Sequence, residues 1–197
     1  MDAINNIEYR GYTISIMYDD YPENPRDWSN LGRMVCFHKR YDLGDKHELD
    51  TCMFSGWEDM KQYIMEEYDC AVILPIYMYD HSGILLSTAP FSCPFDSGQL
   101  GFVYATKEGA RSEFGKVLTQ KRLSEVNDVL KNEVERYSQY LSGDTYYYII
   151  YDSCGDQVES CGTYYGHDGI KQLKEDAKSD IDYYLSAAVK GNAGAMV

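Results

Sequence analysis

The links between strand-like segments constrain the fold of this chain most. Hairpin-length links, as between residues 71–79 and 84–88 or between 145–151 and 157–165, outnumber links that could hold a crossover helix. Parallel neighbours need a crossover of about a dozen residues or more, whereas antiparallel strands can be joined by a tight turn. The pattern therefore predicts an α+β fold with a mainly antiparallel sheet and three to four helices packed on it.

Alternation and apolar runs locate the strands. Residues 12–18 alternate Tyr and Ile with Thr, Ser and Met, which is typical of a strand with one buried face. Residues 71–79 are continuously apolar, which favours a strand buried on both faces, and Pro75 within them predicts an edge, a bulge or an early end. Further strands are expected at residues 34–38, 84–88, 101–105, 145–151 and 157–165.

Helical periodicity and capping residues locate the helices. The strongest stripe, which includes Val126, Leu130 and Val134, predicts a helix over residues 121–141. A second stripe predicts a closing helix over residues 170–189. Two shorter helices are expected, one after a capping box formed by Ser55 and Glu58, the other between a Thr106 cap and Gly115.

Length and composition set the domain organisation and the compartment. With 197 residues, 44% of them hydrophobic, the chain can form one core, so we expect a single α+β domain over residues 1–190 and a flexible tail at 191–197. The N-terminus lacks a secretory signal, and the longest apolar run, residues 70–79, is half of a membrane span. We therefore expect a cytoplasmic protein with no membrane partner and with six free cysteines, none of them in a Cys-x-x-Cys pair.

The charge is strongly negative and uneven. Lys and Arg number 18 against 32 Asp and Glu, a formal net charge of −14. Residues 1–70 carry a net −8 and residues 142–197 a net −5, around a nearly uncharged middle. This balance argues against direct nucleic-acid binding, which needs clustered basic residues. It favours a basic partner, or serves solubility alone.

Three groups of carboxylates are the candidate partner-binding residues. A row of carboxylates spaced like phosphates can occupy the nucleic-acid groove of a basic protein. The candidates are Asp19, Asp20, Glu23 and Asp27 on one loop, Glu66, Glu67 and Asp69 at a helix end, and Glu175, Asp176, Asp180 and Asp182 on the last helix. The chain also has 20 tyrosines, which suit either a protein-binding surface or ordinary strands.

Polar loops supply an alternative interpretation as an enzyme. His38, Asp45, His47 and His81 could hold a divalent metal if their turns met, and His47, Asp80 and His81 could assist a hydrolase acting on nucleic acid or on a nucleotide signal. The same side chains could instead hydrogen-bond the loops in which they stand.

Other chemical motifs are weaker. His81 could act as a base toward Cys93 or Ser97, although Asp96-Ser97-Gly98 has the composition of a turn. No phosphate-binding glycine motif occurs, so we expect no cofactor.

Four segments resemble a known family. Residues 34–47, 74–84, 87–101 and 134–144 are similar, in order, to a largely uncharacterised family of accessory proteins encoded by phages, prophages and plasmids of Gram-positive bacteria. The chain departs from that family at Phe95, where the family has Trp, and at Gly162, where the family has an aromatic residue.

The resemblance implies a gene type whose small acidic members are frequently inhibitors of host defence, including anti-CRISPR and anti-restriction proteins. Together with the charge, it leads us to expect an inhibitor in the bacterial host cell. Such an inhibitor would bind a basic surface of a defence protein, such as a CRISPR effector nuclease, through its acidic patches.

Overall fold

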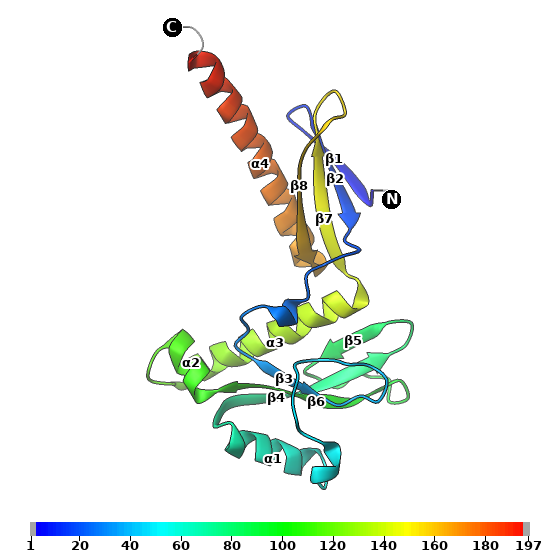
Figure 1. The fold of residues 1–197 in the computed structure, drawn as a ribbon, viewed down its shortest axis with the longest axis vertical. Helices are drawn as coiled ribbons and strands as arrows, with labels where there is room; N and C mark the ends of the chain where they lie inside the picture. Colours follow the sequence, from blue (N-terminus) through cyan, green and yellow to red (C-terminus); the bar gives the residue numbers. More distant parts are fainter. Residues whose placement is uncertain (1–2, 195–197) are drawn as a thin grey trace. The chain divides into compact units, whose positions relative to one another are not determined.

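The computed structural model describes residues 3–194 and groups them into two compact units (Figure 1). The terminal unit contains residues 3–23 and 143–194, and the central unit contains residues 24–142. Each unit has its own four-stranded antiparallel sheet and its own buried core. The predicted α+β class with antiparallel strands is confirmed, but the strands form two sheets, and the domain expected over residues 1–190 covers both units.

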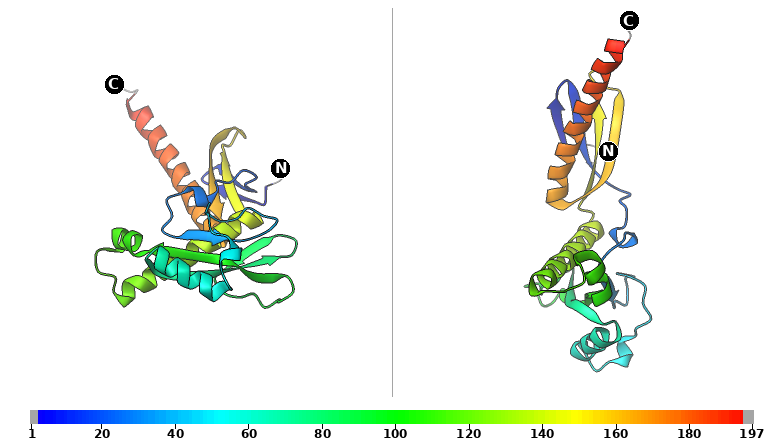
Figure 2. Two further views of the ribbon diagram at one scale, coloured as in Figure 1. Left: turned by 60° about the horizontal axis from the view of Figure 1, so that its bottom comes forward. Right: turned by 90° about the vertical axis from the view of Figure 1, so that its left-hand side faces the viewer.

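The terminal unit is a sheet with one helix against it (Figure 2). Its strands, in the spatial order β1-β2-β7-β8, are β1 (Asn5–Tyr9), β2 (Tyr12–Tyr18), β7 (Thr145–Tyr151) and β8 (Gln157–Tyr165), and its helix is α4 (Gly166–Gly194). The strands predicted over residues 12–18, 145–151 and 157–165 are confirmed at their exact bounds. β1 is not predicted from the sequence; it joins β2 through Arg10 and Gly11, both with positive φ.

The last helix is longer than expected. It begins four residues before the predicted start and continues to Gly194, through part of the predicted tail, whose residues 195–197 lie outside the described residues. Among residues 3–194, no helix has the length and apolar character that crossing a membrane requires.

Apolar residues at every second position of β2 and at every fourth position of α4 form the core of the terminal unit. On β2, Ile14 and Ile16 point to the same face and are buried, because successive strand residues alternate between faces. Leu173, Ala177 and Ile181 recur every four residues along α4 and are fully buried in the same cluster. Tyr146, Tyr148 and Ile150 of β7 complete this core.

The central unit has a sheet in the order β3-β6-β4-β5. Its strands are β3 (Arg33–Cys36), β4 (Cys70–Asp80), β5 (Ile84–Ser87) and β6 (Ser97–Thr106), and its helices are α1 (Trp57–Glu67), α2 (Lys107–Phe114) and α3 (Gln120–Ser142). Two short 3₁₀ helices, η1 (Pro25–Asp27) and η2 (Thr51–Met53), lie in the connecting loops.

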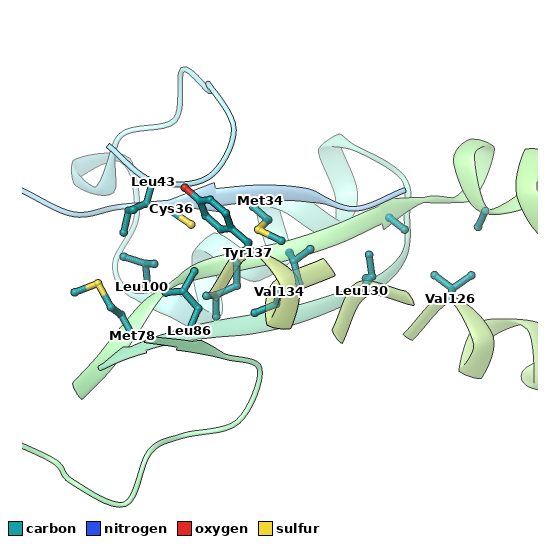
Figure 3. Close-up of a cluster of buried hydrophobic side chains, with 14 residues drawn as sticks. Met34, Cys36, Leu43, Met78, Leu86, Leu100, Val126, Leu130, Val134 and Tyr137 are labelled. Carbon is teal, nitrogen blue, oxygen red and sulfur yellow. The ribbon is translucent and has the colours of Figure 1, made fainter. Parts of the chain in front are cut away.

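The two faces of this sheet pack against different helices. On β6, Val103 and Ala105 face the cluster that contains Val126, Leu130 and Val134 of α3 (Figure 3). The alternate residues, including Phe102, pack instead with the buried residues of α1. Because neighbouring residues of a strand point to opposite faces, one strand supplies both cores.

Local sequence signals are confirmed at two places and wrong at one. Thr106 caps α2, since its Oγ accepts from the Gly109 N–H at 3.1 Å. Pro75 lies on β4 before the stretch Tyr77–Asp80 that pairs with β5, so no strand of the described chain flanks it on that side. The expected Ser55–Glu58 box is wrong, because the helix begins at Trp57 and Ser55 donates to Asp59 instead.

A buried network of charged side chains, centred on Arg26, stabilises the loop before β3. The Arg26 side chain is 5% exposed, and its Nε and Nη2 donate to the two oxygens of Asp45 at 3.0 and 2.6 Å. Nη2 also donates to the carbonyl of Gly32 at 2.8 Å, and Nη1 lies 3.7 Å from Glu133 Oε2. Such a bidentate pair fixes geometry as well as charge.

Glu133 connects this network to α3. Its carboxylate accepts from the N–H groups of Leu31 and Gly32 at 2.8 and 3.0 Å. Burial raises the pKa of Glu133, while these two hydrogen bonds and the Arg26 charge act in the opposite direction. The guanidinium of Arg26 therefore connects the loop before β3, the start of β3 and helix α3.

We expect Arg26→Met to lower the free energy of unfolding by about 3 kcal/mol, because the Asp45 and Glu133 carboxylates would remain buried without a cation. Urea unfolding of the full chain measures this loss. Arg33→Met is the control, since this exposed arginine makes no ion pair among the described residues, and it should change stability by less than about 0.5 kcal/mol. Equal losses in the two variants would contradict the proposed role of Arg26.

Candidate protein-binding surface

Negative charge is concentrated in the terminal unit. Residues 1–23 and 143–197 contain 14 Asp and Glu against 5 Lys and Arg, a net −9, while the larger central unit has 18 against 13, a net −5. The terminal unit contains seven of the candidate residues, namely Asp19, Asp20 and Glu23 after β2 and Glu175, Asp176, Asp180 and Asp182 on α4. The other four, Asp27, Glu66, Glu67 and Asp69, belong to the central unit.

Three carboxylates of α4 accept hydrogen bonds from tyrosines of the sheet. Asp176 Oδ2 accepts from the Tyr164 hydroxyl at 3.0 Å, and Asp180 Oδ2 accepts from the hydroxyl of Tyr148. Asp182 accepts from Tyr9 at 3.3 Å and also pairs with Arg10 at 3.0 Å. Two further tyrosine hydroxyls donate to carboxylates outside α4: Tyr146 donates to Asp144, and Tyr184 of α4 donates to Glu159 of β8.

These pairs shift the titration of the tyrosines. Burial is the largest cause that raises the pKa of Tyr148 and Tyr164, and the hydrogen bonds to Asp180 and Asp176 raise it further. The bond to Glu159 raises the pKa of Tyr184 to about 12. A phenol that donates to a carboxylate resists ionisation, because a tyrosinate in its place would face a like charge.

Asp19 organises the loop that follows β2. Its Oδ1 accepts from the Tyr21 N–H at 3.0 Å and its Oδ2 from the Thr163 hydroxyl at 3.1 Å. Its backbone exchanges bonds with Thr145, which ties the loop to β7. Both oxygens of this carboxylate therefore serve the fold.

The remaining candidates divide into occupied and open carboxylates. In the central unit, Glu66 accepts from Gln62, and Asp69 forms an ion pair with Lys107 at the start of α2. Of the eleven candidates, four are exposed and make no side-chain hydrogen bond or ion pair within residues 3–194: Asp20, Asp27, Glu67 and Glu175. Of these, Asp20 and Glu175 belong to the acidic terminal unit.

The loop after β2 also forms a hollow of about 350 Å³. It is lined by Tyr18, Asp19, Asp20, Tyr21, Tyr147 and Gly162. The sequence predicts only an acidic loop here, and none of these tyrosines was predicted as a site residue. Tyrosines beside paired aspartates directly after an alternating strand were the available signal.

The candidate metal ligands make local bonds instead of meeting. Asp45 is held by Arg26, and His47 Nε2 lies 3.0 Å from the Cys36 carbonyl oxygen. His38 Nδ1 accepts from a backbone N–H of its own turn at 3.2 Å, and His81 Nδ1 lies 3.5 Å from an Asp96 oxygen. Over the described range 3–194, no three His, Cys, Asp or Glu residues are arranged to hold a metal ion.

The candidate nucleophiles also make local contacts. The Ser97 hydroxyl donates to the Cys93 carbonyl at 2.5 Å, and Asp80 donates its backbone N–H to the Asp96 carbonyl at 2.9 Å. All six cysteines are free, as expected, and burial is the largest cause that raises the pKa of the Cys36 thiol to about 12. Cys36 is therefore a poor nucleophile, whereas the candidate Cys93 is half-buried and donates its thiol to Asp96 at 3.7 Å.

Comparison of this chain with models of protein families, with curated proteins and with solved structures finds no match.

We expect Tyr148→Phe to lower the free energy of unfolding by about 2 kcal/mol, because a buried hydrogen bond to a charged group is lost. Urea unfolding measures the change. Tyr21→Phe removes a hydroxyl from a ring that is 93% exposed and should leave stability unaltered. Similar losses from both variants would show that the bond to Asp180 does not stabilise the fold.

The same bonds predict an alkaline limit to stability. Unfolded tyrosines ionise near pH 10, whereas folded Tyr148 and Tyr164 hold their protons to higher pH. Their contribution is therefore fully present below about pH 10 and is lost as the pH rises above it. Tyrosinate absorbance and urea unfolding at successive pH values measure this. Full tyrosine ionisation near pH 10 in a protein that stays folded would contradict it.

Proposed function

We propose that this chain is a mobile-element protein that inhibits a host defence nuclease, as anti-CRISPR proteins do, by docking its acidic terminal unit on a basic surface of the effector. The observation that carries the proposal is the net charge of −9 on the terminal unit, where Asp20 and Glu175 are exposed and unbonded within the described residues. The resemblance of four segments to phage and plasmid accessory proteins supports the class of partner.

The mechanism is competition for a phosphate-binding surface. A nuclease holds the backbone of its nucleic acid with clustered Lys and Arg. A carboxylate surface is attracted to the same residues over long range and, once docked, excludes the nucleic acid.

Hydrogen bonds from tyrosines hold two carboxylates of α4 in place before any partner binds. Asp176 and Asp180 are fixed by hydroxyls, so docking immobilises them at a smaller entropic cost than free side chains. Asp180 accepts from Tyr148, whereas Asp176 accepts from Tyr164 and also from the Gln172 amide at 2.7 Å. An ionised carboxylate has about four acceptor sites, so each still leaves room for a partner's Lys or Arg.

Affinity capture with the tagged full chain from a bacterial host, followed by inhibition assays on the captured effector, tests this proposal. Binding that depends on charge should weaken by about ten-fold or more between low and high salt. Affinity that is flat with salt, or an effector that stays active when bound, would overturn it.

The double variant Asp20→Asn, Glu175→Gln should weaken binding by about ten-fold, because it removes two exposed charges from the acidic unit. The matched control is Glu113→Gln, Glu135→Gln, which removes two exposed carboxylates from the central unit. Calorimetric titration with the captured effector compares the two. Equal weakening would assign the effect to net charge instead of to the terminal unit.

A further inference from the structure

The hollow beside the end of β2 has the size and lining of a side-chain pocket. Its volume of about 350 Å³ lies at the lower end of the range of ligand sites, about 300–1,000 Å³. Its six lining residues all belong to the terminal unit, and none of them is basic. It therefore fits one side chain of a partner in both size and charge.

Tyrosine rings form part of the lining. Tyr18 is 54% exposed and stacks on Tyr146 with ring centroids 5.3 Å apart, which fixes its orientation. Tyr21 is 93% exposed, and Tyr147 is half-buried. The face of an aromatic ring carries a negative quadrupole, which attracts a cation placed over it.

The two aspartates that line the hollow differ in their hydrogen bonding. Asp19 holds the loop through Tyr21 and Thr163, as described above. Asp20, the next residue, is exposed and has no hydrogen bond or ion pair in the described part of the chain. The Asp19 carboxylate fixes the shape of the hollow, and the Asp20 carboxylate is exposed to a ligand.

Gly162 keeps the hollow open. A Cβ at this position would lie 3.1 Å from Asp19 Oδ2 and 3.1 Å from the Tyr147 Cβ, closer than most real contacts. A residue with a side chain would therefore crowd the groups that line the pocket.

We propose that this pocket binds an arginine side chain of the basic partner, an inference that rests on the proposed function and names the contact chemistry of the same unit. A guanidinium is planar, so it stacks on tyrosine rings while it donates in parallel to a carboxylate. The ammonium of lysine is a point charge and uses only part of this arrangement. The pocket is thus the specific contact within a generally acidic surface.

Titration of the full chain with N-acetyl-arginine methylamide, followed by ¹H–¹⁵N NMR, tests the proposal. We expect saturable shifts at the amides of Tyr21, Gly162 and Thr163. The citrulline analogue, which has nearly the shape of arginine without its charge, should give shifts about five-fold weaker or less, and the lysine analogue should bind more weakly than arginine. Equal response to citrulline, equal affinity for lysine, or shifts confined to α4 would overturn it.

Two variants locate the interaction. Asp20→Asn and Tyr21→Ala change exposed side chains and should each weaken arginine binding by about five-fold. Asp156→Asn removes an exposed carboxylate from the β7–β8 loop of the same unit and should leave arginine binding unaltered. A loss with Asp156→Asn equal to that with Asp20→Asn would reduce the site to general charge and overturn the proposal.

The outcomes separate this inference from the proposed function. Capture of a basic effector whose affinity is unaffected by Tyr21→Ala would reject the arginine pocket and leave the inhibitor role standing. Saturable arginine binding in the pocket, without any basic effector in the capture experiment, would support the pocket and reject the inhibitor role.

Discussion

The terminal unit depends on hydrogen bonds between sheet tyrosines and carboxylates. With a single helix against its sheet, this unit fills much of its core with phenol rings, and each buried hydroxyl needs a partner. Asp180 supplies one to Tyr148, Asp176 supplies one to Tyr164, and Asp182 supplies one to Tyr9. The tyrosines packed against α4 therefore engage three of its five carboxylates, whatever the unit binds.

This constraint changes what the charge of −14 means. A carboxylate that accepts from a neutral phenol remains negative, so the bonds order the acidic surface without discharging it. Of these three carboxylates, only Asp182 is also paired with a cation in the described part of the chain, namely Arg10. Under the proposed function, folding and binding would therefore use the same side chains, and neutralising Asp176 or Asp180 would disturb both at once. Asp20 and Glu175, which are exposed and unbonded within residues 3–194, are the positions where the two roles separate.

The sequence predicts local structure well and pairing between distant residues poorly. Alternation over residues 12–18 and the stripe of α3 are local patterns, and both appear as expected. β1 was not predicted because its residues, Asn5–Tyr9, are largely polar and edge strands need little apolar surface. Tyr9 lies 173 residues from Asp182, and Asp45 lies 19 from Arg26, so neither partner is visible from spacing. The division into two units follows from such long-range pairing, since β2 lies next to β7.

Asp19 and Asp20 show why residue type alone does not identify a binding surface. They are adjacent and chemically identical, yet within residues 3–194 both oxygens of Asp19 accept hydrogen bonds and those of Asp20 accept none. The difference comes from the end of β2, where the backbone of Asp19 is tied to Thr145 and its side chain reaches Thr163 on β8. The end of β2 therefore engages the Asp19 carboxylate in the fold and leaves the Asp20 carboxylate exposed, a difference that residue type does not reveal.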